Sequence, residues 1–289
     1  MPFRSFGDRV SPEGAYAMYD VLIAGGTVVD GTGKAGYEAD VAIAGDRIVR
    51  VGRLGDEAAA RRIEAKGRVV CPGFIDIHSH SDASVLLAPR MESKVMQGVT
   101  LELTGNCGES AGPLRGEALA EATKAAEREG GRCDWTGVGD YLERVESRGI
   151  ALNYATLVGH GTLRASVIGN AMRAASRAEL EAMQALLAEA LDEGAYGLST
   201  GLIYPPSAYG DEDELAELST VMAARGGFYA SHVRDEGDRL IESIAEALSI
   251  GRRAGVAVQL SHHKATRKRN WGKVRQSLAM IEEARAAGY

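Results

Sequence analysis

Histidines and a cysteine recur in this chain directly after apolar, strand-like runs. His78 and His80 follow the run in GFIDIHSH, and Cys107, His232 and His262 each follow a later one. The carboxyl ends of parallel strands meet at one face of a β/α barrel, so side chains from distant segments converge there. The pattern therefore predicts a parallel α/β fold with five candidate metal ligands at one face.

The spacing of apolar residues from position 73 onward predicts alternating strands and helices. Strands are expected at 73–78, 99–105, 152–158, 195–200, 227–232 and 256–261, and helices at 116–129, 177–193, 237–254 and 274–288, with another beginning in the acidic run 211–215. The helical segments repeat their apolar residues with a period of about 3.6. Strands that alternate with helices form a parallel sheet, so residues 73–289 are interpreted as a (β/α)8 TIM-like barrel.

The number of expected strands predicts that this barrel is incomplete. Six strands are expected, and an eight-stranded barrel needs two more. We therefore expect these 289 residues to be the N-terminal part of a longer protein whose remainder completes the barrel. The alternative is a complete open sheet of six strands, which would leave the strands before residue 73 without a closing partner.

The first 72 residues follow a different pattern. Within residues 19–72, three segments alternate apolar and polar positions between Gly and Asp turns, which predicts short antiparallel strands: YDVLIAGGTVVD, ADVAIAGDRIVRVG and GRVVCPG. A block of this size is the N-terminal part of a small β domain and needs a partner segment. Residues 1–18 lack an apolar signal core and are expected to form an extension.

Composition limits the partners of the chain. A net charge of −7, with no long basic cluster, argues against a nucleic-acid partner. No run reaches the roughly 18 apolar residues of a transmembrane helix, so no membrane partner is expected. The three cysteines, Cys71, Cys107 and Cys133, cannot form a paired framework, which favours a reducing, cytoplasmic setting.

The candidate ligands have the chemistry of a catalytic zinc site. Side chains two apart in a strand point the same way, so the histidines of HSH share one side. Cys107, His232 and His262 offer a thiolate and two imidazoles, and three protein ligands leave one position for water. Adjacent strand residues face opposite sides, so only one of His262 and His263 can point at the metal, and His262 is chosen because it is nearer the strand body. If no metal is bound, Cys107 is a small buried cysteine, and His78 and His80 are polar residues of a turn at a strand end.

Further polar residues follow the same strands. Lys264 is a candidate for binding an anionic group, or else a solvated loop lysine. His160 either binds substrate or satisfies a loop, and the segment 109–148 either covers the site as a lid or is a solvated excursion. Arg234 and Glu236 are expected to orient His232. Ser199 and Tyr204 are candidates for lining the pocket.

Several strings together resemble one family. They are GFIDIHSHSD, ELTGNCGES, VGHGTLR, GLSTGLIYPP, ASHVRDEG and LSHHK followed by NWG. The chain resembles the N-acyl-D-amino-acid deacylases (D-aminoacylases) of the amidohydrolase superfamily from about Tyr19 to its last residue. This resemblance implies a distorted (β/α)8 barrel with a small β domain built from both chain ends.

The resemblance also implies a site and a reaction. Cys107, His232 and His262 would hold one zinc ion, and His78 and His80 would form a second, weaker position. Water activated by zinc would hydrolyse the linear amide of an N-acyl-D-amino acid, releasing a carboxylate and a D-amino acid. Lys264 would bind the substrate carboxylate, with Tyr204 and Ser199 in the pocket. The family's general base, an aspartate of the eighth strand, is expected beyond Tyr289, so residues 1–289 alone are expected to be inactive.

Three other readings remain open. A cyclic-amide hydrolase of the dihydroorotase or hydantoinase kind usually has a modified lysine in the fourth strand, and AYGLSTG (195–201) contains none. A barrel without catalytic activity would typically have lost metal ligands, whereas this chain keeps all five. A structural zinc site is closed, whereas these ligands lie at glycine-rich strand ends.

Overall fold

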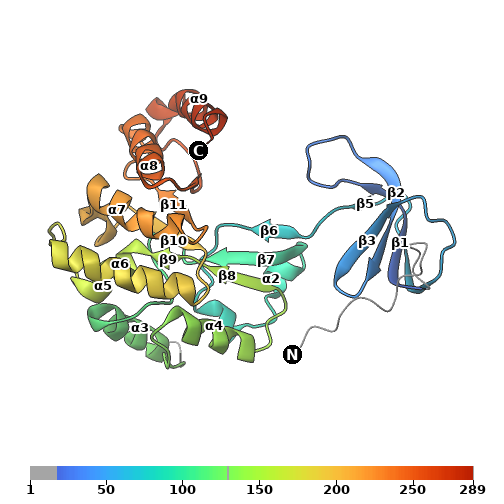
Figure 1. Ribbon diagram of the computed structural model, residues 1–289, viewed down its shortest axis with the longest axis horizontal. Coiled ribbons are helices and arrows are strands. Elements are labelled where there is room, and N and C mark those ends of the chain that lie inside the picture. Colours follow the sequence, from blue (N-terminus) through green and yellow to red (C-terminus); the bar gives the residue numbers. More distant parts are fainter. Residues whose placement is uncertain (1–17, 129, 289) are drawn as a thin grey trace. The chain divides into compact units, whose positions relative to one another are not determined.

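The computed structural model describes residues 18–128 and 130–288 (Figure 1). The chain divides into two compact units, Met1–Gly73 and Phe74–Tyr289, and each is described by itself. The extension predicted for residues 1–18 lies outside the described residues, apart from Met18.

The first unit contains one five-stranded sheet. Its strands are β1 (Tyr19–Val28), β2 (Tyr37–Ala44), β3 (Arg47–Gly52), β4 (Ala59–Glu64) and β5 (Val69–Val70). The pairs β1–β2 and β2–β3 are antiparallel, as predicted. The prediction of an all-antiparallel block was wrong, because β4 and β5 both pair with β1 in parallel. Apolar alternation fixes which face a side chain points to, but it does not fix the direction of a strand.

The second unit contains short parallel strands in chain order. They are β6 (Phe74–Asp76), β7 (Val99–Thr104), β8 (Asn153–Thr156), β9 (Val158–Gly159), β10 (Gly197–Gly201), β11 (Phe228–His232) and β12 (Val258–Leu260). One sheet has the order β6-β7-β8 and the other the order β9-β10-β11-β12, and every pair is parallel. Only Leu157 separates β8 from β9, so the six predicted strand regions are all present.

Helices follow the strands and cover them on the outside (Figure 1). They are α1 (Ser84–Leu87), α2 (Glu92–Val95), α3 (Gly116–Arg128), α4 (Val138–Ser147), α5 (His160–Val167), α6 (Arg177–Asp192), α7 (Glu212–Ala223), α8 (Leu240–Ala254) and α9 (Lys273–Ala286), with short 3-10 turns at Ser207–Tyr209 and Lys268–Asn270. Local signals fix some ends. Ser176 and Glu179 form a capping box at the start of α6, and Gly255 ends α8 in the left-handed conformation.

The main core packs these helices against β10 and β11, and β11 ends in the candidate ligand His232. Leu187 of α6, Leu218 of α7 and Ile250 of α8 are fully buried in one cluster with Leu198 of β10 and Tyr229 of β11. A well-packed core holds strand ends in fixed places, which a metal site needs. None of the helices in the described residues combines the length and apolar character that crossing a membrane requires.

Candidate metal centre

Four of the five predicted ligands meet around one sulfur atom. Cys107 Sγ lies 3.4 Å from His78 Nε2, 3.4 Å from His232 Nδ1 and 3.5 Å from His262 Nε2. Cys107 follows β7, His78 follows β6, His232 ends β11 and His262 follows β12. The carboxyl ends of the parallel strands therefore bring the four residues together. The fifth residue, His80, is exposed, and its ring lies 5.2 Å from that of His78.

A carboxylate that the sequence placed beside His232 also reaches the cluster. Glu236 Oε1 lies 3.1 Å from His262 Nδ1 and 3.7 Å from His232 Nε2, and its side chain is only 10% exposed. Donor atoms within 4.8 Å of one another form two trios, His78 with Cys107 and His262, and His232 with Glu236 and His262. This grouping differs from the predicted trio of Cys107, His232 and His262, although Cys107 contacts both of those histidines.

The electrostatics of the cluster favour neutral imidazoles and a protonated thiol when no cation is present. Burial, with help from neighbouring His262, lowers the pKa of His78 and of His232 to about 4. Burial also raises the pKa of the Cys107 thiol to about 11, and nearby Glu109 adds to this effect. Neutral imidazoles are ready ligands, whereas a thiolate at this position requires a compensating positive charge.

Two buried nitrogens of the cluster make no hydrogen bond, although Glu236 Oε1 lies 3.7 Å from one of them. His78 Nδ1 and His232 Nε2 have no hydrogen bond within the described residues. Buried polar atoms are normally paired, so unpaired ones call for an explanation such as a missing ion or water. The cluster is therefore one that a further ligand would complete.

Two of the central residues have an unusual backbone. Cys107 has φ 54° and His262 has φ 33°, in the left-handed region that non-glycine residues rarely adopt. Such conformations persist only where the surrounding structure imposes them. For Cys107, part of that structure is Ser199, whose hydroxyl donates to Gly105 O at 2.5 Å and accepts from Gly108 N at 3.0 Å. Ser199 is fully buried, so it supports the Cys107 loop rather than facing the pocket predicted for it.

The Cys107 loop also lies against the end of β10 at a distance that only glycine permits. A Cβ at Gly201 would lie 2.1 Å from Cys107 O, and a Cβ at Gly159 would lie 2.5 Å from Gly108 O. Real Cβ atoms essentially never approach so closely. Glycine at these positions therefore fixes where the sulfur is held.

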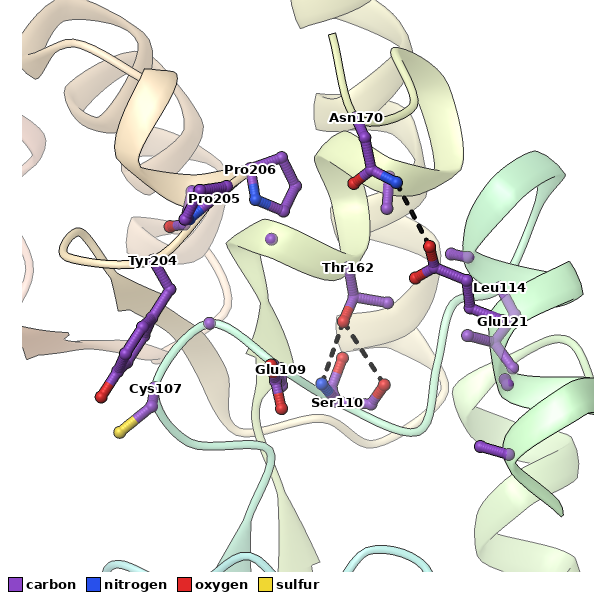
Figure 2. Close-up of a pocket in the computed structure, with 17 residues that line it drawn as sticks. Cys107, Glu109, Ser110, Leu114, Glu121, Thr162, Asn170, Tyr204, Pro205 and Pro206 are labelled. Atoms are coloured by element: carbon purple, nitrogen blue, oxygen red, sulfur yellow. Dashed lines mark hydrogen bonds between the residues drawn. The ribbon is translucent and has the colours of Figure 1, made fainter. Parts of the chain in front are cut away.

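Tyr204 and Lys264 lie at the edges of the cluster. The Tyr204 ring is 5.0 Å from that of His232, and the residue is half exposed. Together with Cys107, Tyr204 lines a cavity of about 370 Å³ (Figure 2). Lys264 forms an ion pair with Glu236, and its Nζ is 3.1 Å from His262 Nδ1. His263 faces away and contacts Ser277 Oγ at 2.8 Å, which leaves His262 as the histidine of this pair in the cluster.

Both ring nitrogens of His160 contact buried side chains of the protein interior, and the residue does not face a pocket. It is fully buried at the start of α5, where Nδ1 lies 2.7 Å from Ser207 Oγ and Nε2 lies 2.8 Å from Glu214 Oε1. Buried Arg164 also pairs with Glu214, at 2.6 Å. This network connects α5 and α7 to the turn after Tyr204, so it holds the segment that carries that tyrosine.

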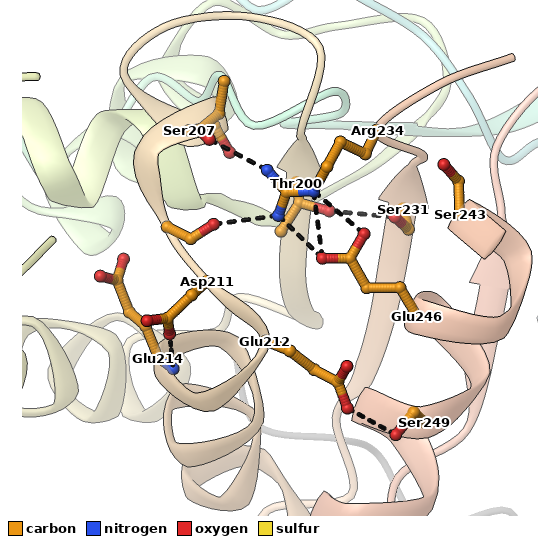
Figure 3. A network of polar contacts seen from close by, with 12 residues as sticks. Thr200, Ser207, Asp211, Glu212, Glu214, Ser231, Arg234, Ser243, Glu246 and Ser249 are labelled. Carbon is orange, nitrogen blue, oxygen red and sulfur yellow. Dashed lines mark hydrogen bonds and ion pairs between the residues drawn. The ribbon is translucent and has the colours of Figure 1, made fainter. Parts of the chain in front are cut away.

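Arg234 was predicted to orient His232, and the structure assigns it a different set of partners. Its guanidinium pairs with Glu246 of α8 at 2.8 Å and donates to Ala208 O and Gly210 O, each at 2.9 Å. Figure 3 shows Arg234 and Glu246 facing one another beside the segment of Ser207. Arg234 and His160 therefore both hold the segment 207–210 in place. Neither contact was predicted from the sequence, because the partners are 12 to 54 residues apart along the chain.

Replacing Glu214 by glutamine should destabilise the complete gene product by about 3 kcal/mol at neutral pH, since it breaks a buried ion pair. Burial alone would raise the pKa of this carboxyl, but the hydrogen bond from His160 and the charge of Arg164 lower it to about 2. The ordinary pKa is higher, so the stabilisation is fully present above pH 4.5 and is lost as the pH falls through about 2.

Urea unfolding of the wild-type and Glu214→Gln proteins measures this difference. The gap between their unfolding free energies should narrow by about 1.4 kcal/mol between pH 7 and pH 3.5. Glu189→Gln, on an exposed part of α6, is the matched control. Its unfolding free energy should equal that of the wild type over the whole pH range. A gap that stayed constant over this range would show that Glu214 is not held ionised by its partners.

Comparison with known proteins agrees with this architecture. A model described as "Amidohydrolase family" matches residues 61–283. The chain is 43% identical over 268 residues to D-aminoacylase of Alcaligenes xylosoxydans xylosoxydans, an alignment that covers 93% of this chain and 55% of that protein. The chain thus spans about half the length of the curated relatives it matches.

Solved structures give the same result. A crystal structure of D-aminoacylase superposes with a TM-score of 0.86 at 44% identity, over 93% of this chain and 56% of that chain. An N-acyl-D-glutamate deacylase from Bordetella bronchiseptica, complexed with zinc and a phosphonate mimic of the tetrahedral intermediate, gives 0.84 at 38% identity, over 94% and 57%. These likenesses confirm the predicted amidohydrolase barrel. On the family match and these likenesses, the chain belongs to the amidohydrolase family and is similar to its N-acyl-D-amino-acid deacylases.

Proposed function

We propose that the complete protein hydrolyses the amide bond of N-acyl-D-amino acids, with a zinc ion held by Cys107, His232 and His262. The observation that carries this proposal is the convergence of three imidazoles on Cys107 Sγ at 3.4–3.5 Å. Tetrahedral zinc, with Zn–S of about 2.3 Å and Zn–N of about 2.0–2.1 Å, separates sulfur and nitrogen ligands by about 3.5 Å. Each of the three sulfur–nitrogen distances therefore has the length expected of two ligands of one zinc ion. His78 and His80 would form a second, weaker position.

A zinc ion at this place would supply Lewis acidity for the amide carbonyl and for the attacking water. The residues of this chain would hold the metal, orient its ligands and position the substrate. Glu236 lies on the outer nitrogens of His232 and His262 and would orient both rings. Tyr204, beside His232, lines the space next to the carbonyl position. The general base is not assigned to a residue of this chain.

Lys264 would bind the substrate carboxylate. Its side chain is 48% exposed, and its ammonium group has three donors, of which Glu236 and His262 Nδ1 engage two, so one remains for the substrate. A carboxylate held there, a carbonyl at the metal and a side-chain pocket are three fixed points, which is enough to distinguish a D- from an L-amino acid.

Replacing Lys264 by glutamine should raise KM by about 10–100-fold, because a charge-assisted hydrogen bond contributes about 1.5–3 kcal/mol to binding. Bound zinc should stay unchanged. Lys268→Gln, in the same exposed segment, is the matched control and should leave KM as it was. Steady-state kinetics with zinc analysis measures this. An unchanged KM, or a loss of zinc in place of a rise in KM, would contradict the role given to Lys264.

The proposed function itself is tested with a substrate panel. The complete gene product, supplied with zinc, is assayed on N-acetyl-D-amino acids, their L-enantiomers and hydantoins. Turnover confined to the D-enantiomers supports the proposal. Turnover of hydantoins alone would favour a cyclic-amide hydrolase, against which the absence of lysine from β10 (GLSTG) now counts. The panel also reveals the preferred side chain. The free cysteines fit the reducing, cytoplasmic setting proposed for the protein.

A further inference from the structure

A cavity opens directly beside the candidate metal centre. Its volume is about 370 Å³, and Cys107 and Tyr204 lie on one side of it (Figure 2). Leu114, Glu121 and Asn170 lie on the opposite side. A second cavity, of about 340 Å³, shares five of its lining residues with the first: Glu109, Ser110, Leu114, Ala122 and Ala125. The two cavities therefore adjoin one another, and together they make up a space that begins at the metal ligands.

Apolar groups form about half of the wall of the first cavity and most of the wall of the second. Leu114, the α3 residues Ala118, Ala122 and Ala125, and Pro206 contribute carbon surface. The polar side chains of the floor are already engaged with the protein. Thr162 Oγ1 accepts from Ser110 N at 3.0 Å, and Ser110 Oγ donates to Gly112 O at 2.7 Å. A ligand here would gain chiefly by removing apolar surface from water.

The charged residues of the walls are acidic. Glu109 and Glu121 line the first cavity, and Asp82 lines the second. Among the described residues that line either cavity, none is lysine or arginine. An anionic group would lose its hydration in this space and find no positive partner, so the space favours a neutral, apolar group.

The two ends of the proposed substrate can now be assigned. The carboxylate of the amino-acid half requires a cation, and Lys264 lies beside His262 and outside both cavities. The amide carbonyl belongs at the Cys107 cluster. Cys107 and Tyr204 also line the cavity, so the neutral acyl half, on the other side of the carbonyl, is directed into it.

We propose that this space is an acyl-chain subsite that accepts unbranched apolar acyl groups considerably longer than acetyl. The inference rests on the deacylase function proposed above and adds to it the chemical class of the acyl group. A space of this volume is much larger than a methyl group, whose burial alone would leave most of it filled with water. Helix α3, in the segment predicted to be either a lid or a solvated excursion, forms its outer wall.

The test measures kcat/KM for a series of acyl groups on the D-amino acid that gives the fastest acetyl hydrolysis. The complete gene product is assayed with acetyl, butanoyl, hexanoyl and succinyl derivatives. We expect kcat/KM to rise about fourfold per added methylene, which corresponds to about 0.8 kcal/mol per buried CH2. Succinyl, which has nearly the length of butanoyl but carries a carboxylate, should fall below butanoyl by at least about tenfold.

Two alanine substitutions on α3 locate the effect. Ala122→Phe projects a ring into the shared space and should reduce the hexanoyl-to-acetyl ratio of kcat/KM by at least about tenfold. Ala120→Phe, the same change on the exposed face of the helix, should leave that ratio as in the wild type. Zinc content and circular dichroism confirm that both variants are folded.

The outcomes separate this inference from the proposed function. Hydrolysis of acetyl substrates with a flat or falling acyl profile overturns the subsite and leaves the deacylase proposal intact. An Ala122→Phe variant that alters the preferred amino-acid side chain instead of the acyl profile also overturns it, because the amino-acid half would then occupy the space. No hydrolysis of any acyl-D-amino acid overturns the proposed function itself.

Discussion

Replacing Cys107 by alanine in the complete gene product should abolish tight zinc binding and lower kcat/KM for an N-acyl-D-amino acid by about 10³-fold or more. Cys107 Sγ contacts three imidazoles from three other strand ends, so its removal takes away the atom on which the cluster is centred. A catalytic zinc ion, as proposed here, would supply several kcal/mol of transition-state stabilisation, and about 4 kcal/mol corresponds to 10³-fold in rate. Zinc analysis after dialysis and steady-state kinetics measure the two effects.

Cys71→Ala is the matched control for this substitution. Cys71 is an exposed, free cysteine in the first unit, and its loss should change neither zinc content nor turnover. A Cys107→Ala protein that kept a full equivalent of zinc and half of its activity would rule out the sulfur as the central ligand. The imidazoles and Glu236 would then have to hold the metal without it.

Replacing Gly201 by alanine should have the second-largest effect, although glycine has no side chain to contribute chemistry. The new Cβ would lie 2.1 Å from Cys107 O and 3.1 Å from the Tyr204 ring. The first of these neighbours is backbone, so the Cys107 loop must move. A displacement of about 1 Å in a catalytic group can reduce the rate about 10²-fold, and we expect a loss of this order in kcat/KM.

The same variant should retain its fold and bind zinc about 10–100-fold more weakly, as expected when a ligand's support is disturbed. Gly52→Ala is the control, because a Cβ at Gly52 meets nothing within 4 Å. Competition with a chromophoric chelator measures zinc affinity. Wild-type affinity and turnover in Gly201→Ala would show that the Cys107 loop has more freedom than its contacts indicate.

The sequence predicted the elements of the barrel well because each of them is a local pattern. The regular alternation of strand and helix from residue 73 led to the six parallel strand regions, and the boundaries of α6 and α8 agree within a few residues. Polar residues at strand ends then led to Cys107, His232 and His262 as neighbours. All of these follow from periodicity and from the common direction of parallel strands.

The features that the sequence did not predict depend on contacts between distant segments. Strand β4, with its exposed and charged AARRIE, has no apolar alternation to identify it, and its parallel direction is set by β1. Arg234 is adjacent to a ligand in sequence, yet it points to Glu246 because α8 passes beside it. Ser199 was predicted to face a pocket, and only the folded chain shows that its hydroxyl is enclosed by the Cys107 loop.

The most direct test of the account is a zinc titration of the metal-free complete gene product, with hydrolysis of matched N-acetyl-D- and N-acetyl-L-amino acids followed at each addition. We expect no turnover without metal, a rise in D-amino acid release in proportion to the first equivalent of zinc, and no L-amino acid release at any point. Equal turnover by the metal-free protein, equal turnover of both enantiomers, or none of either with zinc bound would contradict it.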